Sequence, residues 1–195
     1  MVFTRWVNER AGFTIVELLI VVVVIAILAA ITIISFNGIQ QRANNTAIND
    51  AASKSKRMIE AYIAQTSQYP YTVDDDFACI TTDTGCRRNS SLMVPISAFT
   101  TNVSTVGALP KSAPMATDTR GGITYAYNAA RTVGGVSAPA IISWYIRGVN
   151  SDCGMPVLQV ESALAANISV NKFTTGNIGS SGATQCVASI SGPGV

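Results

Sequence analysis

The most regular feature of the chain is a long apolar run near its N-terminus. From Leu18 to Ile34 the sequence has no charge, no Gly and no Pro, and Thr32 is the only polar side chain. With its flanking apolar residues the run covers residues 13–36, which reaches the roughly 20 residues that a helix needs to cross a bilayer core. A transmembrane helix is therefore expected here. Glu17 is its only ionisable residue, and such a residue indicates a function that depends on a partner charge.

After the apolar run the pattern becomes amphipathic. Apolar and small side chains recur at spacings of three and four, which predicts a helix with one face on a core. Residues 37–68 are expected to continue the same helix, with Asn37-Gly38 as the place where a turn could loosen and Tyr69-Pro70 as its end. The stripe consists of Ile39, Ala43, Ala47, Ile48, Ala51, Ala52, Ser55, Ile59, Tyr62 and Ile63.

The remainder of the chain shows strand patterns after an irregular connection. Residues 69–122 have little periodicity, apart from a short helix expected from Pro95 to about Ser104. Residues 123–195 contain alternating and β-branched segments separated by Gly-rich turns. Strands are expected at 123–127, 140–146, 156–160 and 184–190, with a Gly- and Ser-rich loop at 176–182. The predicted fold class is α+β, a long N-terminal helix packed on a C-terminal antiparallel sheet of roughly three to five strands.

Composition narrows the functional classes. The length of 195 residues fits one domain plus an anchor, and charged residues make up 12% of the chain, about half the usual share. His is absent, which removes the commonest metal ligand and the usual acid–base group at neutral pH. No enzymatic activity is expected. The net charge of +2 gives no indication of a nucleic-acid partner.

The four cysteines lie beyond the apolar run. An even number of cysteines on a translocated segment favours disulfides, and three pairings are possible. Cys79–Cys86 and Cys153–Cys186 are favoured because each pair closes a self-contained loop. A zinc site made of the four thiolates is the alternative, but the chain has no close Cys-x-x-Cys pair to support it.

Two polar patterns are weaker candidates for sites. Asp74, Asp75 and Asp76, with Asp83 nearby, could hold Ca²⁺ because carboxylate oxygens suit a hard cation. Their spacing matches no calcium-loop signature, so a solvated acidic turn is favoured and no other cofactor is expected. Asn-x-Ser/Thr triplets begin at Asn44, Asn89, Asn102 and Asn167; these are interpreted first as chance, with surface glycosylation as the alternative.

A short motif lies where the leader meets the apolar run. Gly12 is followed by Phe13, Thr14 and Glu17, and then by the aliphatic helix. This arrangement resembles the processing and assembly signature of type IV prepilins and the related pseudopilins. The resemblance implies that a prepilin peptidase removes residues 1–12 by cleavage after Gly12, and that Phe13 is then N-methylated. It also implies that Glu17 pairs with the terminal amine of a neighbouring subunit.

The resemblance also implies a location and a set of partners. Before assembly the chain would be a single-pass protein of the cytoplasmic (inner) membrane with its N-terminus inside, which Arg5 and Arg10 of the leader favour. After assembly it would lie in an extracellular pilus. The implied partners are further copies in a helical filament, other pilin subunits, the prepilin peptidase and an inner-membrane assembly platform. Nucleic acid is implied only if the fibre serves DNA uptake.

Three functions follow as expectations. The leading one is a structural subunit of a type IV pilus, serving adhesion, twitching motility or DNA uptake. The second is a pseudopilin of a type II-like secretion or competence system. The third is a single-pass, membrane-tethered adhesin or binding domain that does not polymerise. A cleaved secretory signal is disfavoured because the apolar run is longer than such signals require.

Overall fold

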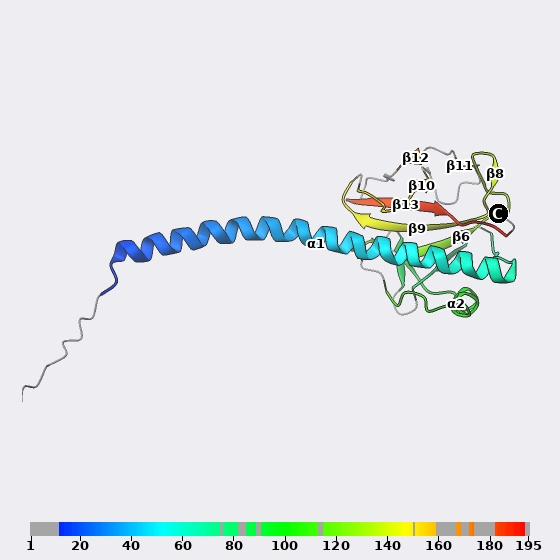
Figure 1. Ribbon diagram of the computed structural model, residues 1–195, viewed down its shortest axis with the longest axis horizontal. Coiled ribbons are helices and arrows are strands. Elements are labelled where there is room, and N and C mark those ends of the chain that lie inside the picture. The colour runs from blue at the N-terminus through cyan, green and yellow to red at the C-terminus, as the bar shows by residue number, and fades with distance from the viewer. Residues whose placement is uncertain are drawn as a thin grey trace, which may run out of the picture. The chain divides into compact units, whose positions relative to one another are not determined.

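The computed structural model describes residues 12–74, 76–81, 85–88, 91–112, 115–149, 151–158, 167–168, 172–173 and 182–193. The chain divides into two compact units. Met1–Gln40 form the helical unit and Gln41–Val195 form the globular unit. Helix α1 (Ile15–Thr66), 52 residues long, supplies residues to both (Figure 1).

Helix α1 is unbroken. Asn37 and Gly38 both lie within it, so the possible loosening of a turn there is not observed. A Cβ added at Gly38 would meet no atom within 4 Å, so no close packing requires a glycine at this position. The first proline after the helix is Pro70, and α1 ends four residues before it, at Thr66.

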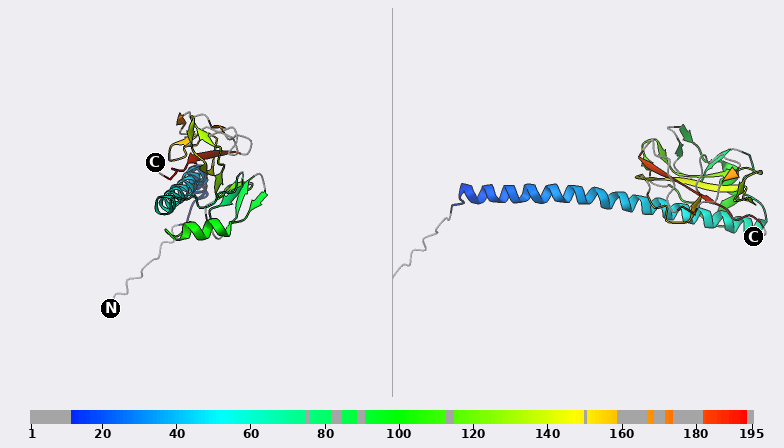
Figure 2. Two further views of the ribbon diagram at one scale, coloured as in Figure 1. Left: turned by 90° about the vertical axis from the view of Figure 1, so that its right-hand side faces the viewer. Right: turned by 90° about the horizontal axis from the view of Figure 1, so that it is seen from above.

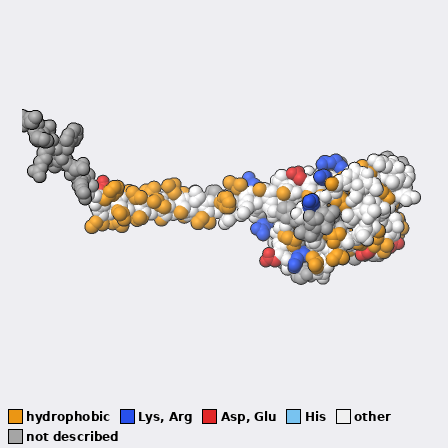
Figure 3. Space-filling model, turned by 90° about the horizontal axis from the view of Figure 1, so that it is seen from below, with side chains coloured by type: hydrophobic (Ala, Val, Ile, Leu, Met, Phe, Trp, Pro, Cys, Tyr) orange, Lys and Arg blue, Asp and Glu red, His pale blue; other side chains and the backbone are white. Residues whose placement is uncertain are grey.

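The helical unit buries none of its described side chains. The large apolar residues from Phe13 to Ile33 are between 47% and 82% exposed. Figure 3 shows these side chains along the helix surface, with no Lys or Arg among them. The segment from Ile15 to Ile34 spans about 30 Å at the rise of an α-helix, which is the thickness of a hydrocarbon core. By length and composition α1 is the one described helix that could cross a membrane.

The centre of the globular unit is a four-stranded antiparallel sheet in the order β1-β6-β9-β13. Trp144 in the middle of β9 lies opposite Ile123 of β6 and Cys186 of β13. The fold class predicted from the sequence is confirmed, since a long N-terminal helix packs on an antiparallel sheet (Figures 1 and 2). The strands are β1 (Phe77–Cys79), β6 (Ile123–Tyr127), β9 (Ala140–Arg147) and β13 (Ala183–Ser189).

Smaller elements surround the central sheet. A second sheet has the order β3-β2-β5-β4, a third the order β11-β7-β8, and β10 pairs with β12. Helix α2 (Ser97–Ser104) lies where the sequence predicts a short helix. The strands of these sheets are β2 (Cys86–Arg88), β3 (Ser91–Met93), β4 (Met115–Thr117), β5 (Arg120–Gly121), β7 (Thr132–Val133), β8 (Val136–Ser137), β10 (Val157–Leu158), β11 (Asn167–Ile168) and β12 (Lys172–Phe173). Of the predicted strand 156–160, residues 159 and 160 lie outside the described residues, as does most of the predicted loop 176–182.

The main core lies between α1 and one face of the central sheet. Ile48, Ala52, Ile59 and Ile63 of α1 are at most 2% exposed and belong to one cluster with Trp144. The stripe predicted from the sequence is therefore buried only in its C-terminal part. Ile39, Ala43 and Ala47 are exposed, because polar amides rather than apolar side chains contact the sheet on the first turns of α1 in the globular unit.

Candidate functional site

The motif residues form the start of α1. Gly12, Phe13 and Thr14 precede the first helical residue, Ile15, and all three are exposed. Phe13 is 82% exposed, and a Cβ added at Gly12 would meet no atom within 4 Å. A peptidase would therefore reach the Gly12–Phe13 bond without displacing any described part of the chain.

Thr14 and Glu17 form a reciprocal cap on the helix. The Thr14 backbone N–H donates to Glu17 Oε2 at 2.9 Å, and its hydroxyl donates to the same oxygen at 2.8 Å. In return the Glu17 N–H donates to Thr14 Oγ1 at 3.2 Å. This is a capping box, which satisfies orphan N–H groups in the first turn of a helix. This role of Thr14 was not predicted from the sequence, although Thr-x-x-Glu before an apolar run is the signal for it.

The cap defines what Glu17 can do chemically. One carboxylate oxygen holds the first turn of α1, and the negative charge lies at the N-terminal end of the helix, where the helix dipole favours an anion. Cleavage after Gly12 would create a cationic α-amine at Phe13, next to the capping residue Thr14. The start of α1 would then carry one anion and one cation within a single turn, surrounded by exposed apolar side chains.

These features together describe an exposed Gly12–Phe13 bond, a capped helix start and an apolar helix joined to a sheet domain. Residues 8–33 match the family model described as the prokaryotic N-terminal methylation motif. The chain therefore carries the type IV prepilin-type signature, and the resemblance stated from Gly12, Phe13 and Glu17 is confirmed at this level. The match supports a type IV pilin-like or pseudopilin-like precursor. No curated protein and no solved structure matches the chain.

Two disulfides fasten segments to the central sheet. Cys79 bonds to Cys86 and Cys153 bonds to Cys186, the pairing favoured from the sequence. The first joins β1 to β2, and the second joins the segment after β9 to β13. All four cysteines are 0% exposed. The alternative of a four-thiolate zinc site is wrong, since every cysteine is disulfide-bonded.

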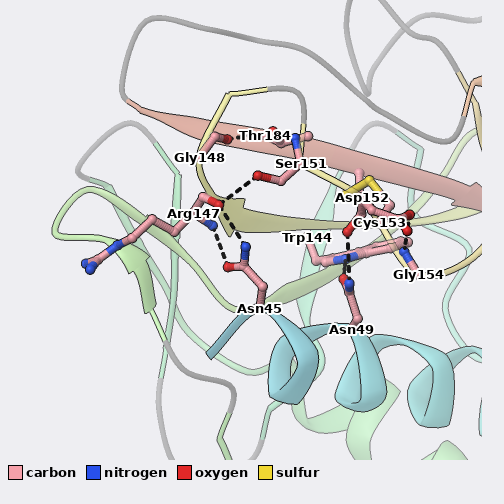
Figure 4. The surroundings of a disulfide bond; sticks show 11 residues. Asn45, Asn49, Trp144, Arg147, Gly148, Ser151, Asp152, Cys153, Gly154 and Thr184 are labelled. Carbon is pink, nitrogen blue, oxygen red and sulfur yellow. Dashed lines mark hydrogen bonds between the residues drawn. A yellow bond between two sulfur atoms is a disulfide. The ribbon is translucent and has the colours of Figure 1, made fainter. Parts of the chain in front are cut away.

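Next to the second disulfide, side-chain amides of α1 bind the end of β9. We call Gln41, Asn45 and Asn49 the amide seam. Asn45 exchanges two hydrogen bonds with the backbone of Arg147, receiving its N–H at 2.9 Å and donating to its carbonyl at 2.8 Å (Figure 4). Gln41 donates to the same carbonyl at 3.2 Å. At Arg147, the last residue of β9, the amide side chains thus make the backbone hydrogen bonds that a neighbouring strand would otherwise make.

Asn49 forms the inner end of the amide seam. Its Oδ1 accepts a hydrogen bond from the indole N–H of Trp144 at 2.9 Å, and its Nδ2 donates to the carbonyl of Asp152 at 3.1 Å (Figure 4). Trp144 is 0% exposed, so Asn49 supplies the acceptor that a buried indole requires. Asp152 directly precedes Cys153, so Asn49 also fixes the segment that carries the disulfide.

The aspartates proposed as a weak Ca²⁺ site are bound to protein groups. Asp74 Oδ1 accepts the Ala129 N–H at 2.8 Å, and Asp76 accepts the Phe77 N–H at 2.8 Å and the Tyr71 hydroxyl at 2.6 Å. The pKa of Tyr71 is raised by this hydrogen bond to the Asp76 carboxylate and by burial. Within the described residues no group of three His, Cys, Asp or Glu side chains could hold a metal ion. Asp75 and Asp83 lie outside the described residues.

Two of the four glycosylation triplets have their amides engaged in the fold. Asn44 Nδ2 donates to the Met115 carbonyl at 3.2 Å, and Asn102 Nδ2 donates to the Pro70 carbonyl at 2.8 Å. Attachment of a glycan would break these bonds. Asn89 and the side chain of Asn167 lie outside the described residues.

Proposed function

We propose that this protein is a structural subunit of a type IV pilus, processed after Gly12 and polymerised through the apolar part of α1. The observation that carries the proposal is the methylation motif at residues 8–33, which from Ile15 onward forms a helix with exposed apolar side chains. An enzymatic role is not part of the proposal. The globular unit supplies the part of each subunit that faces away from the fibre axis.

The apolar side chains of the helical unit need a cover that the single chain does not provide. Burying one large aliphatic side chain is worth about 1.5–3 kcal/mol, and the exposed set from Ile15 to Ile33 contains many of them. A bilayer covers them before assembly, and a bundle of such helices covers them in a filament. Because lipid tails are as apolar as these side chains, the transfer between the two covers is near neutral and leaves specificity to polar groups.

Glu17 is the polar group available for that specificity. In the proposed filament the Glu17 carboxylate pairs with the Phe13 α-amine of a neighbouring copy. Thr14 of the same chain continues to cap the helix. A wrong stagger leaves a charge unpaired in apolar surroundings, and that is costly. The pair therefore selects the register between subunits, and apolar packing supplies the bulk of the contact.

A pseudopilin of a secretion or competence system is the second candidate, because the same N-terminal signature is shared by that group. The two differ in the length of the fibre. Electron microscopy of material sheared from the cell surface distinguishes them, since a pilus subunit should appear in long fibres and a pseudopilin should not.

The test separates the charge of Glu17 from its capping role. Glu17→Gln keeps an acceptor for Thr14 but removes the charge, whereas Thr14→Ala removes the two hydroxyl bonds of the cap and keeps both the charge and the backbone bond to Glu17. The proposal expects sheared filaments to fall to background with Glu17→Gln and to persist with Thr14→Ala. N-terminal mass analysis of each variant verifies processing after Gly12.

Three experimental results would each contradict part of the proposal. Normal filament yield with Glu17→Gln would overturn the register role. A processed parent chain that remains monomeric in detergent and never appears in filaments would instead favour the membrane-tethered, non-polymerising alternative. A parent chain that starts at Met1 would contradict the processing step.

A further inference from the structure

The exposed charges in the described part of the globular unit are unevenly distributed along the central sheet. Four arginines from four elements gather where β9 ends, and we call this the arginine end. Arg147 is the last residue of β9, and Arg120 precedes β6, whose first residue Ile123 lies opposite Trp144. Arg87 of β2 lies opposite Gly121, the residue after Arg120. Arg42 lies on α1 between Gln41 and Asn45, which bind the Arg147 backbone.

Two of the four arginines of the arginine end are held by contacts within the fold. The backbone of Arg147 is held by Asn45, and its Nε donates to the Ala116 carbonyl at 3.0 Å. The rest of the guanidinium points away from the seam (Figure 4). Arg120 donates to the Tyr145 hydroxyl at 3.1 Å and lies 5.0 Å from the centre of that ring. The guanidinium groups of Arg147 and Arg120 are therefore held in place.

The opposite end of the same sheet carries aspartates, and we call it the aspartate end. Asp74 forms a bridge with Tyr127, which lies opposite Ala140, the first residue of β9. Asp76 directly precedes β1. By the rise of a strand, the two ends are about 23 Å apart along β9. On the face shown in Figure 3 the Lys and Arg side chains lie in the left and middle parts of the globular unit, and Asp and Glu side chains appear in both its left and right parts.

Each end also carries side chains of the opposite charge, but the arginine end remains the more positive and the aspartate end the more negative. Asp118 and Asp152 lie among the four arginines of the arginine end and leave it positive. At the aspartate end Lys56 is paired with Glu60, whose carboxylate also accepts the Ser191 N–H. The adjacent Arg57 is exposed and donates to the Ser53 hydroxyl, which leaves one cation against the carboxylates of Asp74 and Asp76. Arg131 is 0% exposed and donates to the Pro139 carbonyl, so it presents no charge to a partner surface.

We propose that the arginine end of one copy docks on the aspartate end of the next copy along the filament. This inference rests on the proposed function, because it requires copies in a fibre. Head-to-tail contacts that do not close into a ring present a different surface at each end of every subunit, and here those surfaces have opposite charge. Complementary charge fixes register and suppresses wrong contacts more than it adds affinity. A second copy of the chain is the partner that fits, because the surface of opposite charge, the aspartate end, lies on the same chain as the arginine end.

The test is a charge swap in full-length chain, produced in cells that process it. Arg42→Glu and Arg147→Glu reverse charges at one end, and Asp74→Arg reverses the other. Each single reversal should lower the yield of sheared filaments roughly two- to tenfold. The loss should be larger at low ionic strength, because salt screens exposed charges. Combining Arg147→Glu with Asp74→Arg should restore most of the yield.

Controls separate docking from folding. Lys54→Glu reverses an exposed charge on α1 between the two ends and should leave the yield unchanged. Arg42→Glu leaves the Arg147–Ala116 bond intact, and Asp74→Asn keeps the oxygen that accepts the Ala129 N–H while removing the charge. Thermal melting of each solubilised variant should match the parent chain, so that reduced filament yield reports assembly.

A photoreactive amino acid at position 42 provides a direct readout. It should link to the peptide that contains Asp74 in a second copy. Links that map elsewhere on the second copy, or that reach only lipid or nucleic acid, would overturn the docking. Unchanged filament yield in every reversal variant, with Glu17→Gln still blocking assembly, would also overturn it and leave the proposed function standing. A parent chain without filaments would overturn both.

Discussion

The two parts of α1 use the same kind of side chain for different purposes. Ile25 is 58% exposed and Ile59 is 0% exposed, although both are isoleucines of one continuous helix. The residues around Ile59 are covered by the chain's own sheet, whereas those around Ile25 are covered by nothing in the part of the chain that the structure describes. In the proposed filament, folding and assembly depend on separate stretches of one helix, and substitutions in each stretch should affect different measurements.

The largest expected effect is at Ile59, in the part of α1 that the sheet covers. Ile59→Ala leaves a cavity between α1 and the sheet and should lower the free energy of unfolding of the globular unit by about 2–5 kcal/mol. The matched variant Ile25→Ala should leave that free energy unchanged and lower filament yield instead. Denaturant unfolding of the full chain in detergent, followed by near-ultraviolet circular dichroism, measures the first quantity. Equal destabilisation by both variants would contradict the separation.

A smaller effect is expected at the amide seam, where polar groups take the place of the apolar stripe. Asn49→Ala leaves the indole N–H of buried Trp144 without its acceptor and should cost about 1–3 kcal/mol. Asn45→Ala removes bonds to backbone groups that water can reach, and should cost less. Denaturant midpoints and the fluorescence of Trp144 follow both variants. If Asn45→Ala lowers the free energy of unfolding more than Asn49→Ala does, the main role of the amide seam is to hold the end of β9 and not to bind the indole of Trp144.

The smallest effect at neutral pH concerns Tyr125, which becomes important in alkali. Its hydroxyl donates to the Tyr71 carbonyl at 3.0 Å, and burial, with Tyr69 and Tyr127 nearby, raises its pKa far above the ordinary value. The folded chain then keeps a proton that the unfolded chain releases, so stability is full below about pH 10 and is lost as pH rises further. The thermal midpoint should therefore stay level from pH 6 to 9 and fall above about pH 10.

Tyr125→Phe tests this assignment. It should lower the free energy of unfolding by about 0.5–1.5 kcal/mol at pH 7 and make the alkaline fall shallower. Part of the fall should remain, because the pKa values of Tyr69 and Tyr71 are also raised. An alkaline profile identical to that of the parent chain would assign the transition to other groups.

Long periodic segments explain why much of the fold could be predicted from the sequence. The apolar run after Glu17 and the strands at 123–127 and 140–146 repeat their pattern often enough to identify the element. Strand β1 was not predicted, because three residues cannot establish an alternation. Its position depends on pairing with β6, which lies more than forty residues away in sequence.

Most contacts at the candidate site that were not predicted from the sequence involve polar residues of α1 or of its first turn. Asn45 and Asn49 look like solvated positions, and only their spacing of four with Gln41 indicates a continuous face. Their partners are backbone groups of a distant strand end, which a single sequence does not reveal. Thr14 could have been assigned from the Thr-x-x-Glu pattern, because a capping box is local in sequence.

The burial of all four cysteine sulfurs has a consequence for the order in which this protein matures. The bonds Cys79–Cys86 and Cys153–Cys186 lie inside the finished globular unit, where an oxidant has no access. We therefore expect oxidation to precede or accompany closure of the core. For a subunit that is translocated as proposed, the two disulfides would close only once the globular unit has entered an oxidising compartment.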